Sequence, residues 1–152
     1  MEELPKGISV SLQDYEFDSH KKGRSTIPLL RVTISGVPTI GGLVALMKQV
    51  RLMTSTIRGE YIAITDLSNI EVNKIFESFI LFGMEKSYKI FLSVKNQAKI
   101  SFVVLGKKQN NRLISDTLQR INRDIVKEDY SYKYYFLEDE SKISELVEKG
   151  IK

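Results

Sequence analysis

The chain has 152 residues and a formal net charge of +4, a length at which one domain is expected. Hydrophobic residues make up 42% of it and charged residues 28%, a balance typical of globular proteins and not of disordered or collagen-like chains. Because there is no cysteine and only one histidine, His20, the composition excludes disulfides, thiolate zinc sites, cysteine nucleophiles and multi-histidine metal sites. We therefore expect no metal, no cofactor and no enzymatic activity.

The N-terminal residues, MEELPKGISVSL, lack the basic start and the apolar run of a signal peptide. The longest purely apolar runs in the chain cover about four residues, whereas a helix that crosses a bilayer needs about 20. We therefore expect a cytoplasmic protein without a membrane span.

Two strands are expected in the first quarter of the chain. Residues 8–12 alternate apolar and polar side chains, which is the period of a half-buried strand. Residues 29–35, LLRVTIS, are rich in β-branched residues and are bounded by proline and glycine. The polar stretch 13–26 between them either continues the sheet around Tyr15–Phe17 or forms a loop.

A helix follows, because apolar residues recur at helical spacing from Leu43 to Ile57. Residues 61–65, YIAIT, form a short and almost wholly apolar run, typical of a strand that is buried on both faces. Ser68 and Glu71 then have the spacing of a capping box, in which the serine hydroxyl accepts a hydrogen bond from the third helical N–H. This pattern predicts a second helix that begins at Ser68.

The second half of the chain continues the alternation. Residues 85–97 fit both a strand and a helical stripe, and we favour a helical piece. The elements expected after it are a strand over 99–105, a helix with apolar positions from Leu113 to Ile125, a strand over 130–137 and a terminal helix over 141–151. This order predicts a single α/β domain over residues 1–152, with helices packed on a mixed, mostly parallel sheet of about four or five strands.

The succession LLRVTISG, helix, YIAITDLS, helix, KISFVVLG, helix, YKYYF and LEDESKISELV resembles STAS-like domains. These have the fold of bacterial anti-anti-sigma factors, and one branch is similar to the CRAL-TRIO lipid-transfer fold. The likeness spans residues 29–150. It implies a non-enzymatic regulatory module that binds a kinase-like partner and is switched by phosphorylation of a serine after the Asp-containing strand. Ser68 is the serine nearest that position, and residues 69–74 stand where the phosphorylated members have an Asp-Ser-Ser-Gly-like segment.

The first candidate site follows the strand at 61–65, where open α/β sheets usually bind their ligands. It comprises Asp66, Ser68, Asn69 and Lys74. A partner-contacting loop is one interpretation of these residues. The other is a capping box worth about 1 kcal/mol of helix stability, which is the more common use of this spacing.

The second candidate site lies in residues 95–127, which carry eight basic side chains against Asp116 and Asp124. Such a segment could bind a phosphate, an acidic protein or an anionic lipid. The two aspartates lie four residues from arginines, so a self-paired, solvated helix face is the more common interpretation. The candidate residues are Lys107, Lys108, Arg112, Arg120 and Arg123.

Tyr130, Tyr132, Tyr134 and Phe136 alternate along the expected strand, beside Lys133, as in a face on which RNA bases stack. The consensus tract of RNA-recognition domains is absent, however, and aromatic residues are ordinary strand formers. We therefore expect no nucleic-acid partner.

These observations predict a cytoplasmic regulatory or scaffolding module without catalytic activity. We expect it to bind a protein partner, or a second copy of itself as a homodimer, through exposed helical faces at residues 68–74 and 111–127. The alternative is a carrier that holds a lipid or another small apolar ligand between the helices and the sheet. Leu81, Phe82 and Met84 are the candidate lining residues of such a cavity.

Overall fold

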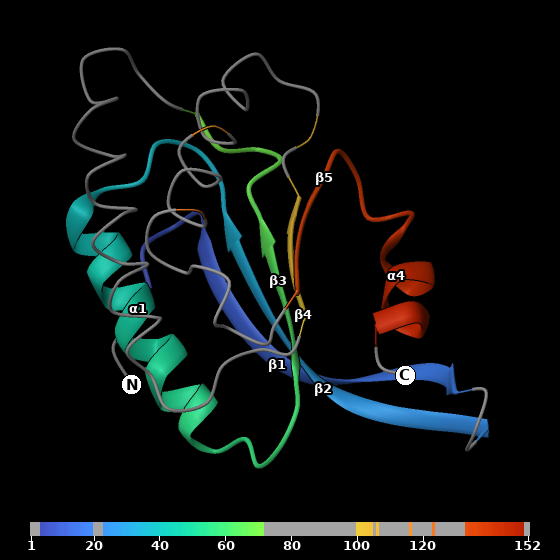
Figure 1. Cartoon of the computed structure of the whole chain (residues 1–152). Helices are drawn as coiled ribbons and strands as arrows, with labels where there is room; N and C mark the ends of the chain where they lie inside the picture. Colours follow the sequence, from blue (N-terminus) through green and yellow to red (C-terminus); the bar gives the residue numbers. More distant parts are fainter. Residues whose placement is uncertain are drawn as a thin grey trace.

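The computed structural model describes residues 4–19, 23–71, 100–104, 106, 116, 123 and 133–150. The elements in this part of the chain are β1 (Ile8–Ser19), β2 (Gly23–Ile34), α1 (Ile40–Ser55), β3 (Ile62–Asp66), β4 (Ile100–Val104), β5 (Lys133–Leu137) and α4 (Ile143–Gly150). The strands form one sheet in the order β1-β2-β3-β4-β5 (Figure 1). β1 is antiparallel to β2, and β2 to β5 are parallel to one another. The predicted α/β class with a mixed, mostly parallel sheet is confirmed.

The described residues of the polar stretch 13–26, which are 13–19 and 23–26, belong to the sheet. β1 and β2 pair over twelve residues each, from Ile8 opposite Ile34 to Ser19 opposite Gly23. Pairing between β2 and β3 begins only at Leu29, so the end of this hairpin extends beyond the rest of the sheet. Apolar side chains such as Tyr15 alternate with the polar ones and pack on the core, which explains why the polar stretch continues the strand.

Pro28 lies inside β2 without costing the sheet a hydrogen bond. The Ser35 N–H donates to the Gly7 carbonyl at 2.8 Å, in register with the β1–β2 pairs. Hydrogen-bonded and non-bonded pairs alternate in an antiparallel ladder, so the even-numbered residues of β1 and β2 exchange no hydrogen bonds with one another. Pro28 is even-numbered and precedes the first residue paired with β3, where its missing N–H is not needed.

α1 covers one face of the sheet. It begins at Ile40, three residues before the predicted Leu43, because the Thr39 hydroxyl caps it by accepting a hydrogen bond from the Gly42 N–H at 3.0 Å. Its apolar stripe packs on the even-numbered residues of β2 and on neighbours from β3 and β4. The principal members of this core are Leu30, Val32, Ile34, Leu43, Leu46, Val50, Tyr61 and Val103.

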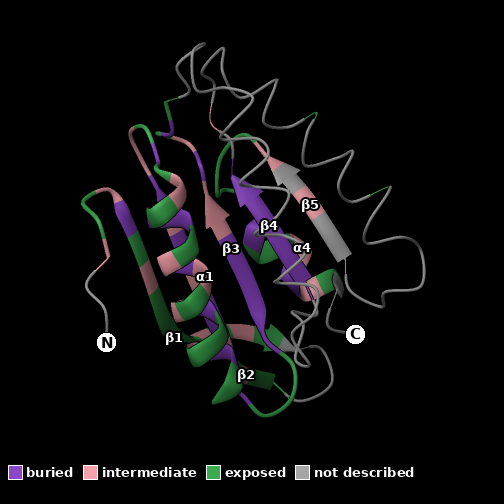
Figure 2. Ribbon diagram, turned by 90° about the vertical axis from the view of Figure 1, so that its left-hand side faces the viewer, coloured by how far each residue is buried: buried purple, intermediate pink, exposed green. Residues whose placement is uncertain are grey.

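α4 lies on the other face of the sheet (Figures 1 and 2). Ile143 and Val147 are buried there against the odd-numbered residues of β2 and the even-numbered residues of β3 and β4. The Phe102 and Tyr135 rings stack in this second core, with their centroids 5.5 Å apart. Apolar layers on both faces explain why β3 and β4 are nearly continuous apolar runs. The other core members include Ile27, Leu29, Ile62, Ile64, Ile100 and Val104.

The strands predicted at 61–65, 99–105 and 130–137 and the terminal helix at 141–151 correspond to β3, β4, β5 and α4. Of the helix predicted to begin at Ser68, only residues 68–71 are described, and they are not helical. The helical piece predicted around residues 85–97 lies outside the described residues. Within the predicted basic helix only Asp116 and Arg123 are described, and both are exposed and have helical backbone. Neither described helix is long and apolar enough to cross a membrane.

Candidate functional site

The first candidate site lies at the edge of the sheet where the parallel strands β2, β3 and β4 end. We call residues 66–71, which start at the last residue of β3, the carboxyl-edge loop. Gly36 follows β2 and Gly106 follows β4, on either side of this loop. Parallel neighbouring strands bring their carboxyl ends to one edge, which is the usual location of sites in open α/β sheets.

Asp66 holds the start of the carboxyl-edge loop. Its Oδ1 accepts a hydrogen bond from the Ser68 N–H at 3.0 Å and from the Ser68 hydroxyl at 2.6 Å. This is the local turn that an aspartate forms with the backbone two residues ahead. Between them, the Leu67 N–H donates to the Val104 carbonyl at 2.8 Å and extends the pairing with β4. Asp66 therefore fixes the orientation of both the backbone and the hydroxyl of Ser68.

The predicted capping box at Ser68 and Glu71 is wrong. The Ser68 hydroxyl donates to Asp66, and the Glu71 N–H donates to the Gly36 carbonyl at 2.7 Å. The Gly36 N–H in turn donates to the Asn69 carbonyl at 3.0 Å, so that Gly36 and Ile70 form a parallel bridge. The loop continues the pairing between β2 and β3, and this long-range partner replaces the local cap expected from the spacing.

Gly106 closes the other side of the loop. Its φ of +70° is unfavourable for any residue with a side chain. A Cβ at this position would lie 3.1 Å from both the Cβ and the carbonyl oxygen of Ser68. Glycine is therefore required here by the backbone conformation and by the close approach of the carboxyl-edge loop.

Arg31 lies near this edge on the α4 face of the sheet. Its guanidinium forms a two-point contact with Glu140, in the segment between β5 and α4, with Nη2 and Oε2 at 3.3 Å. The hydrogen bond to Glu140 raises the pKa of Arg31 above its ordinary value, and the negative charge of Asp66 acts in the same direction. Arg31 thus links the carboxyl-edge loop electrostatically to the segment that leads into α4.

The structure brings together three of the sequence-predicted site residues, Asp66, Ser68 and Asn69. Asp66 and Ser68 are half-buried, whereas Asn69 is exposed. Arg123 is described and exposed, and it belongs to the second candidate site. The remaining candidates lie outside the described residues, as do the histidine and the candidate lining of an apolar cavity: Lys74, Lys107, Lys108, Arg112, Arg120, His20, Leu81, Phe82 and Met84.

Four residues of this edge were not singled out by sequence reasoning: Gly36, Gly106, Arg31 and Glu140. The sequence offered a signal for the two glycines, because each follows the end of a strand by two residues, at the edge where sites are expected. Arg31 had a second signal, since it is the only charged residue in LLRVTIS. Glu140 had none, because its partner is 109 positions away in the chain.

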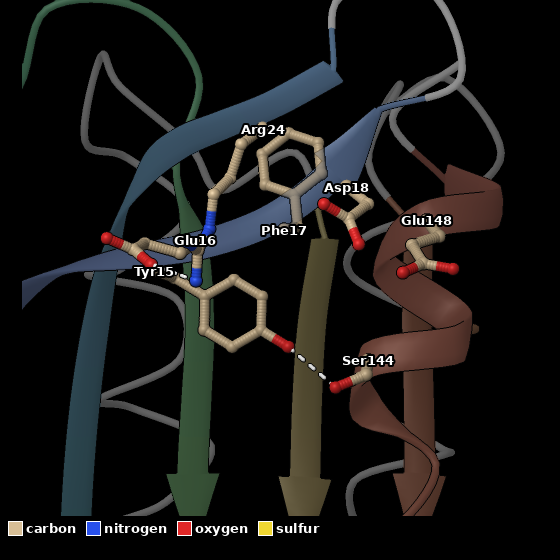
Figure 3. Close-up of a pocket in the computed structure, with 7 residues that line it drawn as sticks. All are labelled: Tyr15, Glu16, Phe17, Asp18, Arg24, Ser144 and Glu148. Carbon is tan, nitrogen blue, oxygen red and sulfur yellow. Dashed lines mark hydrogen bonds and ion pairs between the residues drawn. The ribbon is translucent and has the colours of Figure 1, made fainter.

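A second concave surface, of about 150 Å³, lies between the end of the β1–β2 hairpin and α4 (Figure 3). The Tyr15 hydroxyl and the Ser144 hydroxyl are hydrogen-bonded at 2.9 Å across it, and Arg24 forms an ion pair with Glu16 at 3.0 Å. The Tyr15–Ser144 hydrogen bond attaches the hairpin to α4, whereas the Arg24–Glu16 ion pair joins the two strands of the hairpin. The residues around it are Tyr15, Glu16, Phe17, Asp18, Arg24, Ser144 and Glu148.

In the described part of the chain, no group of three or more histidine, cysteine, aspartate or glutamate residues could hold a metal ion. On β5, Tyr135 packs into the core beneath α4, whereas the side chains of the predicted stacking face lie outside the described residues. Comparison of the chain with protein-family models, with curated proteins and with solved structures found no match. A functional proposal therefore rests on the geometry of the carboxyl-edge loop.

Proposed function

We propose that this chain is a STAS-like regulatory or scaffolding module that binds a protein partner through its carboxyl-edge loop. The observation that carries the proposal is that the loop is hydrogen-bonded to both neighbouring strands and still presents an exposed surface. Val104 and Gly36 hold its backbone from the two sides. Such a segment has a defined shape before a partner arrives, which reduces the entropy that binding costs.

The exposed part of this surface combines polar and apolar groups. Asn69 and Glu71 are exposed on the carboxyl-edge loop itself. Val37, next to the bridging Gly36, has 49% of its surface exposed. An exposed valine beside an amide and a carboxylate has the mixed character of a protein-binding surface.

The polar groups of Asp66 and Ser68 support binding in preference to catalysis. The Ser68 hydroxyl donates a hydrogen bond to Asp66 Oδ1, and the same oxygen also accepts a hydrogen bond from the Ser68 N–H. These bonds are internal and hold the shape of the loop. Nucleophilic use of a serine requires an adjacent base that is itself oriented for proton transfer, whereas both hydrogen bonds that Asp66 Oδ1 accepts from Ser68 belong to the turn.

The strand order supports the STAS-like part of the proposal. β2, β3, β4 and β5 lie side by side in chain order and all run parallel. Right-handed crossover connections build such a sheet one strand at a time. This is the arrangement implied by the succession of strand and helix segments that resembles the family.

The test is retention of binding partners by immobilised protein in an extract of the native cells, followed by quantitative mass spectrometry. Val37→Asp and Asn69→Arg should each abolish retention of the partner, because they change the charge of the proposed surface. Leu52→Asp is the matched control, since Leu52 on α1 is 61% exposed and lies outside this surface. If the two surface variants and the control retain the same proteins as the unaltered chain, the proposal is wrong.

A further inference from the structure

β1 forms one edge of the sheet, and no described strand lies beyond it (Figure 2). The strand is twelve residues long, and an edge of this length presents a row of backbone donors and acceptors to which another strand can pair. Proteins usually protect such an edge with charged side chains, bulges or covering segments. The distribution of charge along β1 therefore bears on what can pair with it.

The direction of the backbone groups follows from the hydrogen bond between Ser35 and Gly7. Odd-numbered residues of β1 bond to β2, so the N–H and C=O groups of Val10, Leu12 and Asp14 point away from the sheet. The edge available for pairing starts after Ile8, because the Ile8 N–H donates to the Pro5 carbonyl at 3.1 Å.

Within β1, charged side chains protect only one half of this edge. In the second half of β1, the residues whose backbone groups point away from the sheet are all acidic: Asp14, Glu16 and Asp18. The first half carries Val10 and Leu12 at these positions, and 39% of the Leu12 surface is exposed. An edge that is acidic in one half and apolar in the other favours a partner of complementary pattern.

We propose that a second copy of this chain pairs with β1 in antiparallel orientation about a two-fold axis at Leu12, so that two sheets become one. Leu12 then lies opposite Leu12 of the partner subunit, and Val10 lies opposite Asp14 of the partner subunit. In the same register Ile8 lies opposite Glu16 of the partner subunit, and Lys6, in the turn before β1, lies near the end of the partner's strand that contains Asp18 of the partner subunit. A closed two-fold interface uses the same patch on both copies.

Charge complementarity favours this occupant and this orientation. The acidic half of each β1 lies against the start of the other, next to Lys6 and the N-terminus of α1. That terminus packs against the start of β1, since a Cβ at Gly42 would lie 3.0 Å from Ile8 Cδ1. The first turn of α1 contains no acidic residue, and the positive end of a helix favours negative charge nearby.

Three other arrangements are less favourable. A two-fold axis at Asp14 places like charges directly opposite one another, and a parallel arrangement aligns the two acidic halves. A register that places Lys6 near Glu16 of the partner subunit uses a carboxylate that already forms an ion pair with Arg24, at 3.0 Å. This interface goes beyond the proposed function and is separate from the carboxyl-edge loop, so either can fail without the other.

Sedimentation equilibrium over a range of protein concentrations, with circular dichroism as a check of folding, tests the interface. The unaltered chain should show a monomer–dimer equilibrium. Leu12→Pro should raise the dimer Kd by about a hundredfold or more, because it removes an outward N–H, and main-chain hydrogen bonds give strand addition its affinity. Leu12→Val is the matched control and should leave the Kd within about threefold, since it keeps the N–H and an apolar side chain.

A charge exchange tests the register without disturbing the backbone. Lys6→Glu and Asp18→Lys should each raise the dimer Kd by about tenfold, and the double variant should restore it, because both contacts are formed again with reversed sign. A chain that stays monomeric at all concentrations overturns the proposal. A dimer that is unaffected by Leu12→Pro and by both charge variants overturns it as well, since its interface must then lie elsewhere.

Discussion

At the scale of single residues, glycines decide how closely the chain segments at the carboxyl edge approach one another. Gly36 and Gly106 have the same φ of +70°, but their surroundings differ. A Cβ at Gly36 would meet no atom within 4 Å, whereas at Gly106 it would crowd Ser68. One position therefore requires glycine for its conformation alone, and the other for its conformation and for space.

The two glycines form a matched pair for mutagenesis. Gly36→Ala should lower the free energy of unfolding by about 1–2 kcal/mol, the cost of the left-handed conformation for a residue with a Cβ. Gly106→Ala should cost more, by roughly a further 1 kcal/mol or above, because the carboxyl-edge loop must also shift. Urea unfolding of both variants measures the difference. Equal costs would show that the approach of Ser68 to Gly106 does not constrain the loop.

At the scale of elements, α4 depends on its packing more than on its own helix propensity. It has eight residues, fewer than an isolated helix needs to be stable in water. Of its own residues, Val147 is fully buried and Ile143 is 5% exposed. The ion pair of Lys149 with Glu145 at 3.1 Å is exposed and contributes little.

Substitutions within α4 should separate these two contributions. Val147→Ala should lower the free energy of unfolding by about 2 kcal/mol, because it removes buried methyl groups and leaves a cavity in the core. Lys149→Ala should change it by less than about 0.5 kcal/mol, since it removes only an exposed i,i+4 pair. Thermal and urea unfolding of the two variants provide the measurement. A loss in Val147→Ala no greater than that in Lys149→Ala would contradict the packing of α4 on the second core.

At the scale of the whole molecule, the sheet is held unevenly along its length. β3 has a hydrogen-bonded neighbour on each side. The end of the β1–β2 hairpin has no β3 alongside it, because that pairing starts at Leu29. The resistance of backbone amides to exchange with solvent should therefore vary along a single strand.

Amide hydrogen exchange followed by NMR can detect this variation in β2. The even-numbered N–H groups of β2 point away from β1, so those of Leu30 and Val32 face β3, whereas those of Arg24 and Thr26 have no described strand opposite. Exchange should be slower by about a hundredfold or more at the first two. Uniform protection of all four amides would show that another segment pairs with the end of the hairpin.

Patterns within a few neighbouring residues were read correctly from the chain. Composition alone excluded disulfides, because the chain has no cysteine. The apolar runs at 61–65 and 99–105 identified β3 and β4, and helical spacing from Leu43 identified α1. Burial on both faces requires apolar side chains at every position of a strand, so this signal is contained in the strand itself.

The long-range contacts were settled only by the tertiary structure. Residues 13–19 and 23–26 extend the two strands because Tyr15 and Phe17 pack on the α4 face of the sheet. Ser68 and Glu71 do not cap a helix in the predicted way, because Asp66 and Gly36 are available as partners. A backbone N–H takes whichever acceptor the fold brings within reach, and that choice depends on segments far apart in the chain. The sequence by itself therefore determined the class of the fold and its central elements, whereas the edge at which the candidate site lies depended on how those elements meet.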